Sequence, residues 1–149
     1  MLRLDISDMK SSEQVRIKIV RSWEEDPITN LYREAGWLKE RTSSVDIGML
    51  IEGSFLFAVA INVSSGKTVG MGRAISDGIA DAYIQDLIVS LEWRGLGVGK
   101  MILRTLLETC FSRGISWIGL IAQPGTDCFY RSLGFAPMEK HIPMLLSRR

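Results

Sequence analysis

Apolar and polar residues alternate with a period of two near the start of the chain. Val15, Ile17 and Ile19 alternate with mostly polar neighbours, which is typical of a half-buried strand over 15–20. The pair Asp26-Pro27 then predicts a helix start, with Asp26 as N-cap and Pro27 at the first helical position. Apolar residues continue at helical spacing, interrupted by a glycine at position 36. We therefore expect a helix, or two short helices, between Pro27 and Arg41.

Three apolar runs in the middle of the chain predict consecutive strands. Phe55 to Val63 and Thr68 to Ile75 are separated by Ser64-Ser65-Gly66-Lys67, a turn of hairpin length. The turn Ser76-Asp77-Gly78 precedes the third run, Ala82 to Val89. Because connections this short join antiparallel neighbours, we expect an antiparallel meander.

The periodicity becomes helical after Arg94. Apolar residues recur every four positions from Val98 to Cys110, and form one stripe of a helix that ends near Gly114. The short apolar run Ser116 to Ala122 predicts another strand. It would lie parallel to the strand before the helix, because a helix connects the two.

The end of the chain predicts one more helix and further strands. Thr126 to Leu133 is expected to form a short helix that stops at Gly134, and Phe135 and the stretch Ile142 to Leu146 are candidates for final strands. The fold class is therefore α+β (mixed α/β): a central, mostly antiparallel sheet with one parallel βαβ crossover and helices on both faces. We expect residues 1–149 to form a single domain.

Length and charge narrow the classes of function. The 149 residues are enough to bury a proper core. The formal net charge is only +1, from 18 Lys and Arg against 17 Asp and Glu, whereas proteins that bind nucleic-acid backbones concentrate positive charge. The longest apolar run, Phe55 to Val63, is far shorter than the roughly 20 residues that span a bilayer. We therefore expect neither a nucleic-acid nor a membrane partner.

Cysteine and histidine are scarce. Cys110 and Cys128 are too few for a disulfide framework, and no Cys-x-x-Cys pair offers a structural zinc site. The segment Met1 to Lys10 lacks the apolar core of a signal peptide. These features favour a cytoplasmic protein without a metal. His141 is the single histidine, so a Ser-His-Asp or Cys-His mechanism would have to use it.

A glycine-rich segment, Arg94-Gly95-Leu96-Gly97-Val98-Gly99-Lys100, lies between a predicted strand and a predicted helix. Glycines let the backbone turn tightly and approach a ligand, and the helix N-terminus directs free N–H groups to the same place. Such an arrangement binds anions, most often phosphate. The dinucleotide fingerprint would need Gly in place of Lys100, and a Walker A loop would need Gly in place of Arg94 and Ser or Thr in place of Met101. The alternative is that the glycines only permit close packing of strand and helix.

A second motif, Phe129-Tyr130-x-x-x-Gly134-Phe135, follows downstream. A tyrosine there is by itself well explained as a core residue with its hydroxyl at the surface. The two motifs in this order, separated by one strand, make the sequence resemble the GNAT superfamily of N-acetyltransferases. The resemblance extends from about Ser54 to Phe135. The stretches Gly72 to Gly78 and Leu31 to Trp37 are similar to its branch of small, mostly single-domain enzymes.

The resemblance implies acetyl-CoA as co-substrate. Backbone groups of Leu87, Ile88 and Val89 would pair with the pantetheine arm as an added strand would, and a backbone N–H there would polarise the acetyl carbonyl. The loop that begins with Arg94 and Gly95 would bind the pyrophosphate through backbone N–H groups from Leu96 to Lys100. The family's position for an asparagine that contacts the pantetheine arm is Gln123 here, so that contact is in doubt.

The resemblance also implies direct attack by an acceptor amine on the thioester, with Tyr130 as the general acid that protonates the leaving thiolate. The acceptor would be a primary amine of a small molecule, an amino acid or a peptide. The general base stays open between Asp86, Gln85 and a chain of waters. Tyr32 and Trp37 are candidate walls of the acceptor pocket, with packing in the core as the favoured alternative.

Two further questions stay open in the sequence. The competing function is a non-catalytic acyl-CoA-binding or regulatory module of the same fold, although such a module does not need the hydroxyl of Tyr130. Many members of the family dimerise, so a homodimer is an alternative to a monomer.

Overall fold

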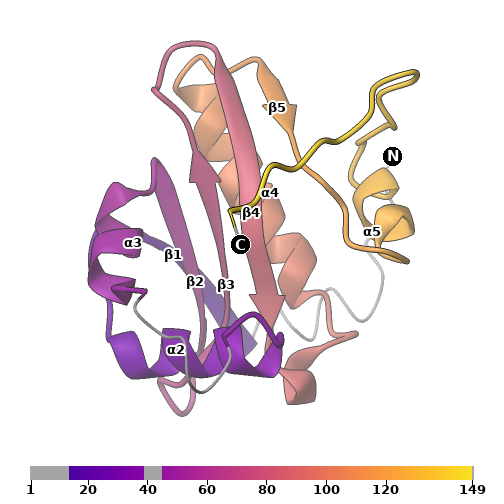
Figure 1. The fold of residues 1–149 in the computed structure, drawn as a ribbon. Coiled ribbons are helices and arrows are strands. Elements are labelled where there is room, and N and C mark those ends of the chain that lie inside the picture. The colour runs from indigo at the N-terminus through magenta and orange to yellow at the C-terminus, as the bar shows by residue number, and fades with distance from the viewer. Residues whose placement is uncertain (1–13, 39–44, 149) are drawn as a thin grey trace. The chain divides into compact units, whose positions relative to one another are not determined.

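The computed structural model describes residues 14–38 and 45–148 (Figure 1). They form two compact units, one that ends at Gly119 and one that begins at Leu120.

The first unit is built on a five-stranded sheet in the order β1-β2-β3-β4-β5. Its strands are β1 (Val15–Val20), β2 (Leu56–Asn62), β3 (Thr68–Ile75), β4 (Asp81–Val89) and β5 (Trp117–Gly119). Neighbours from β1 to β4 are antiparallel, and β4 and β5 are parallel. The predicted meander, the parallel crossover and the mixed α+β fold class are therefore confirmed, although β5 is shorter than the run that predicted it.

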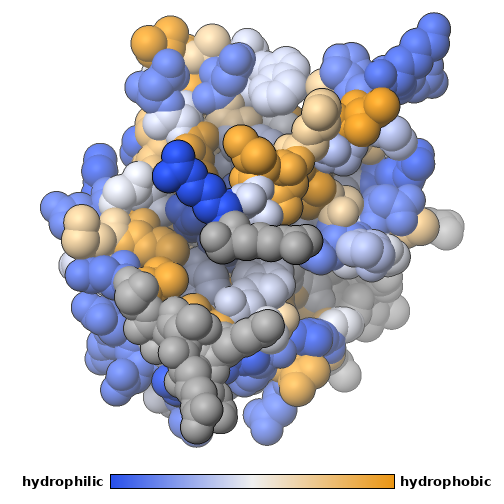
Figure 2. All heavy atoms as spheres, viewed as in Figure 1, coloured by the Kyte–Doolittle hydropathy of each residue, from blue (hydrophilic) through white to orange (hydrophobic). Residues whose placement is uncertain are grey.

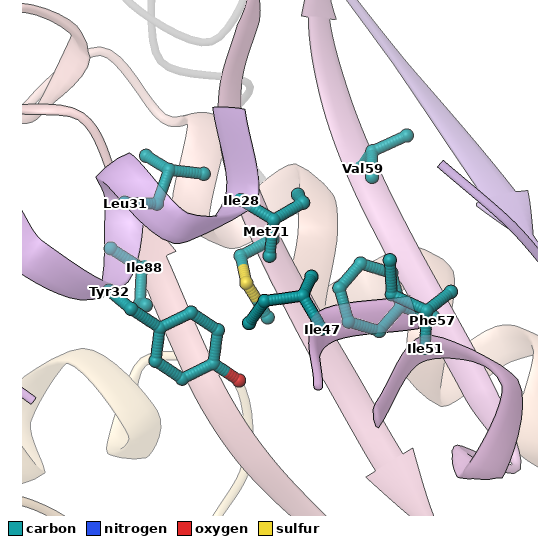
Figure 3. Close-up of a cluster of buried hydrophobic side chains, with 9 residues drawn as sticks. All are labelled: Ile28, Leu31, Tyr32, Ile47, Ile51, Phe57, Val59, Met71 and Ile88. Carbon is teal, nitrogen blue, oxygen red and sulfur yellow. The ribbon is translucent and has the colours of Figure 1, made fainter. Parts of the chain in front are cut away.

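Helices cover both faces of this sheet. They are α2 (Glu25–Glu34), α3 (Ile47–Gly53) and α4 (Val98–Ser112), and a short 3₁₀ helix, η1 (Leu91–Trp93), precedes α4. Alternation along β3 separates the two layers, because Gly70 and Gly72 face Ile102 of α4 whereas Met71 points the other way. Met71 lies in a buried cluster with residues of α2, α3, β2 and β4 (Figure 3): Ile28, Leu31, Tyr32, Ile47, Ile51, Phe57, Val59 and Ile88. A strand covered on both faces reads as a continuous apolar run, as β2 does.

Helix α2 begins earlier and ends earlier than predicted. Its N-cap is Glu24, which makes no side-chain cap hydrogen bond, so the prediction of Asp26 as N-cap is wrong. Asp26 and Pro27 instead lie in the first turn, where a carboxylate favours the positive helix end and the missing N–H of proline has no partner to lose. Gly36 adopts a φ of 74° just past the helix. Residues 39–41 of the predicted helix lie outside the described residues.

The sequence analysis missed α3. Asp46 caps this helix, and its side chain accepts a hydrogen bond from the backbone N–H of Met49 at 2.9 Å. Ile47 and Ile51, four positions apart, are the residues that it buries. A capping aspartate before two apolar residues at helical spacing was the available signal, but seven residues hold too few repeats to stand out.

The second unit contains α5 (Asp127–Arg131), and Gly134 follows it with a φ of 94°. The predicted helix over 126–133 is therefore confirmed at its centre. The final strands are wrong for the described residues, because 135–148 contain no strand. Pro143 removes a backbone donor from this stretch, and Leu146 is 95% exposed, so neither a ladder nor a buried face is available to hold a strand there.

The surface mixes hydrophilic residues with separate hydrophobic patches, as the face in Figure 2 shows. Positive and negative side chains nearly cancel over the whole chain, at a formal net charge of +1. An anionic ligand would therefore depend on local groups rather than on the field of the whole molecule. No helix within 14–38 and 45–148 is long and apolar enough to cross a membrane.

Gly72→Ala should destabilise the first unit. A Cβ at this position would stand 2.9 Å from Cγ2 of Ile102 and 3.1 Å from Cδ1 of Leu87, so the closely packed layer would have to shift. Overpacking of this kind costs about 1–3 kcal/mol of unfolding free energy, measurable by urea denaturation. Gly53→Ala is the matched control, since its Cβ would meet nothing within 4 Å. Equal losses in the two variants would contradict the packing assigned to Gly72.

Candidate active site

The C-terminal half of β4 has an open edge. Pairing with β5 covers only Asp81–Tyr83, and in the part of the chain that the structure describes no strand continues beside Ile84–Val89 on that side. Free N–H and C=O groups on such an edge can pair with an extended ligand. Leu87, Ile88 and Val89, three of the predicted cofactor residues, all lie in this half of the strand.

The same half of β4 contains a bulge. Met71 pairs with Ile88 and Arg73 pairs with Gln85, so Asp86 and Leu87 together lie opposite the single residue Gly72. Asp86 adopts a φ of 56°, in the left-handed region that non-glycine residues seldom occupy. Such a conformation costs about 1–3 kcal/mol and persists only where the surroundings fix it, which is most common at functional sites. A bulge also redirects the backbone groups of the strand.

Two donors hold the carboxylate of Asp86. Nε of Arg73 donates to Oδ2 at 2.6 Å, and the hydroxyl of Tyr32 donates to the same oxygen at 2.7 Å. Nη2 of Arg73 also donates to Oε1 of Gln85 at 3.0 Å. The side chains of Arg73 and Asp86 are only 15% and 21% exposed, so water screens this ion pair weakly.

Tyr32 connects this polar cluster to the core. Its ring belongs to the buried cluster of Figure 3, and Trp37 packs edge-on against it with centroids 6.1 Å apart. Burial, followed by the hydrogen bond to Asp86, raises the pKa of the Tyr32 phenol far above its ordinary value. Tyr32 is therefore a protonated donor at neutral pH. The expectation of a core residue is confirmed for Tyr32, whereas Trp37 is 41% exposed.

The sequence analysis missed Arg73 as a site residue. The register of the predicted hairpin could have indicated Arg73, because a turn at 76–78 brings residues 72–73 opposite residues 85–86. No local pattern connects Tyr32 to either of them, because 54 positions separate Tyr32 from Asp86.

The glycine-rich segment forms the turn that leads from η1 into α4. Gly95 and Gly97 have φ values of 73° and 82°, and Gly97 is the N-cap of the 15-residue helix α4. Val98 to Lys100 form its first turn, whose N–H groups have no intrahelical partner. A Cβ on Gly95 would meet nothing within 4 Å, so close packing does not explain this glycine. The turn thus directs backbone donors and the positive end of the helix dipole to one place.

Side chains brace the segment between β4 and this turn. Nε of Arg94 donates to the carbonyl oxygen of Val89 at 2.8 Å. Glu34, in the last turn of α2, accepts from the backbone N–H of Leu91 at 3.1 Å and from the hydroxyl of Ser90 at 3.5 Å. Arg94 to Lys100 and the open edge of β4 are therefore adjacent parts of one continuous stretch of the first unit.

Tyr130 lies in α5 of the second unit. Its ring packs edge-on against Phe129 and against Phe135, with centroids 5.0 and 6.0 Å away. Burial raises the pKa of the Tyr130 phenol above its ordinary value, so the hydroxyl is protonated at neutral pH, as a proton donor must be. The role of Tyr130 in catalysis stays a prediction. His141 is exposed in the same unit, and its Nδ1 lies 2.8 Å from the carbonyl oxygen of Glu139.

Comparisons with known proteins agree on one family. A family model described as an acetyltransferase (GNAT) domain matches residues 52–137. The ycf52 protein of Porphyra purpurea, named as an uncharacterized N-acetyltransferase, is 33% identical over 72% of this chain and 62% of its own length. The chloroplastic serotonin N-acetyltransferase 2 of Oryza sativa subsp. japonica is 38% identical over 49% of this chain and 36% of its own length. The chain thus spans less than two thirds of either relative.

A solved structure is similar in fold. A GNAT-family acetyltransferase of Streptococcus pneumoniae TIGR4 superposes with a TM-score of 0.73 at 23% identity, over 91% of this chain and 98% of that one.

Proposed function

Because the chain belongs to the GNAT family of acetyltransferases, we propose that it transfers an acetyl group from acetyl-CoA directly to a primary amine. The acceptor is a small molecule, an amino acid or a peptide, and both units serve this reaction as one domain. The observation that carries the proposal is the bulged, open edge of β4, which continues through the turn at Arg94 to Gly97 into the N-terminus of α4. The open edge of β4 can pair with an extended pantetheine arm, and the N-terminus of α4 can bind a phosphate.

In this proposal, acetyl-CoA lies along that stretch. The pantetheine arm pairs with backbone groups of Leu87, Ile88 and Val89. The pyrophosphate takes N–H donors from Leu96 to Lys100 at the start of α4, with Gly95 giving the turn its shape. Backbone donors and a helix dipole bind a polyanion without a basic surface, which fits the net charge of +1.

The proposed reaction has one chemical step with two proton transfers. The amine nitrogen attacks the thioester carbonyl carbon, the C–N bond forms, and the C–S bond breaks. A backbone N–H at the bulge of β4 stabilises the negative charge on the carbonyl oxygen. The thiolate takes a proton from the hydroxyl of Tyr130. The amine loses its proton to a base, for which the candidates are Asp86 and a water chain, either free or held by the amide of Gln85.

Acetyl-CoA should raise the melting temperature of the protein and release free thiol only when a suitable amine is present. A ligand at about 100 times its Kd stabilises the folded state by about 2.7 kcal/mol, which is a readily measured shift. A thiol-release screen across amines, with acetyl-CoA alone as control, tests turnover and finds the acceptor. No shift and no heat of binding would remove the cofactor assignment. Binding without release across all amine classes would favour the non-catalytic acyl-CoA module.

The compartment and the oligomeric state belong to the proposal as well. Both cysteines, Cys110 and Cys128, are free thiols, which suits a reducing compartment. We favour the cytoplasm, with a plastid as the alternative because the serotonin N-acetyltransferase similar to this chain is named as chloroplastic. Size-exclusion chromatography with light scattering distinguishes a monomer from a homodimer.

A further inference from the structure

We propose that Tyr32, Arg73 and Asp86 form a positioning cluster that fixes the bulge of β4, so that Asp86 acts through its backbone conformation and not as the general base. This inference rests on the proposed acetyl transfer. It removes Asp86 from the candidate bases and leaves a water chain, either free or held by the amide of Gln85, to accept the proton of the amine. It also assigns functions to Tyr32 and Arg73, which lie outside the glycine turn.

The contacts of the Asp86 carboxylate oppose a role as base. Oδ2 already accepts from Arg73 at 2.6 Å and from Tyr32 at 2.7 Å. A base must take up a proton, and a neutral Asp86 would leave the guanidinium of Arg73 without its counter-charge in a place where that side chain is only 15% exposed. Burial raises the pKa of the Tyr32 phenol, so Tyr32 keeps its proton and stays a donor to the Asp86 carboxylate.

The same contacts explain how Asp86 keeps its left-handed backbone. Its side chain is anchored from two elements, by Tyr32 of α2 and by Arg73 of β3, while its backbone belongs to β4. Gly72 opposite the bulge leaves room on the other face, where Cδ1 of Leu87 lies 3.1 Å from the position that a Cβ would take. The peptide between Asp86 and Leu87 is thus held from both faces of the sheet. A fixed peptide is what a preorganised donor to a carbonyl oxygen requires.

Helix α2 braces this part of β4 at two points. Tyr32 holds the bulge, and Glu34 holds the backbone N–H of Leu91, two residues after the strand ends. Loss of the Tyr32 hydroxyl therefore leaves the second brace, and a phenylalanine keeps the ring in the buried cluster of Figure 3. Tyr32→Phe should fold, and its effect should be local to the bulge.

The first experiment is steady-state kinetics of Tyr32→Phe against Tyr83→Phe, a control that removes a tyrosine hydroxyl from β4, the strand that contains the bulge. Loss of a whole donor to an oxyanion costs about 10²–10³-fold in kcat, so a displaced donor should cost about tenfold. We expect that drop in kcat for Tyr32→Phe, with the KM for acetyl-CoA within about twofold and the pH–rate profile unmoved. A kcat equal to that of Tyr83→Phe would overturn the inference.

The second experiment substitutes Asp86 itself. Asp86→Asn tolerates a left-handed backbone and keeps a side-chain oxygen that can accept from Tyr32 and Arg73, whereas Asp86→Ala does neither. If Asp86 positions the bulge, Asp86→Asn retains at least about tenfold more kcat than Asp86→Ala. If the two variants lose activity equally, Asp86 is needed as a carboxylate and the inference is wrong.

Amide hydrogen exchange keeps the test separate from the proposed function. Exchange of those backbone amides at 86–88 that bond to β3, followed by NMR, should be about tenfold faster in Tyr32→Phe than in Tyr83→Phe, the factor expected for one lost hydrogen bond. This holds even if the wild-type protein acetylates nothing, which would contradict the proposed function alone. Unchanged exchange at 86–88 would contradict the positioning cluster alone.

Discussion

Tyr130→Phe should lower kcat about 10²–10³-fold and leave the affinity for acetyl-CoA within about twofold, because positioned general acids contribute of that order. Phenylalanine preserves the edge-on ring contacts with Phe129 and Phe135, so the variant removes a proton and little else. Burial raises the pKa of the Tyr130 phenol above its ordinary value of about 10, so the acid stays protonated through neutral pH. Single-turnover thiol release measures the chemical step, and calorimetry measures the affinity.

The pH dependence gives this prediction a second measurement. Since the pKa of Tyr130 is raised, ionisation of this group should cause no fall in the wild-type rate below about pH 10. Phe129→Leu is the control for disturbed ring packing in α5, and it should lower kcat much less than loss of the hydroxyl does. An unchanged kcat in Tyr130→Phe would remove this residue from the mechanism and favour water as the proton donor.

Much of the first unit could be predicted from the sequence, because short turns determine its topology. The turn at 64–67 sets the β2–β3 hairpin, and β3 has the bounds that its apolar run predicted. The four-residue spacing from Val98 to Cys110 predicts α4 and its buried stripe. In each case hydrophobic periodicity and turn residues predict the same element, and that element is also the one that packs in the folded unit.

The parts that escaped prediction depend on distance along the chain or oppose local preference. Asp86 adopts a left-handed backbone conformation inside a strand, and its side chain contacts Tyr32 and Arg73 from two other elements. The bulge shifts the register of β4 within a run that reads as an ordinary strand. The prediction of final strands was wrong because it rested on apolar composition alone. Pro143 has no backbone N–H to donate to a neighbouring strand, and Leu146 has no buried face to pack against.

Gly97→Ala should weaken acetyl-CoA binding at least about tenfold, which is about 1.4 kcal/mol, with a smaller effect on the stability of the fold. Gly97 combines a φ of 82° with the N-cap position of α4. A Cβ there would strain the left-handed turn and stand beside the N–H groups proposed to bind the pyrophosphate. Gly66→Ala is the matched control, because its φ of 72° imposes the same strain in the β2–β3 turn and its Cβ would meet nothing within 4 Å.

Comparing these two alanine variants separates the effect on acetyl-CoA binding from the effect of backbone strain. Both lose comparable unfolding free energy from backbone strain, so calorimetric affinity for acetyl-CoA is the quantity that should separate them. If Gly97→Ala binds as tightly as Gly66→Ala, the glycines at 95–99 serve only the chain reversal into α4. If affinity falls in Gly97→Ala alone, the loss belongs to the backbone donors at the helix N-terminus, because no charged side chain has changed. That result would explain how a chain of net charge +1 holds a polyanionic co-substrate.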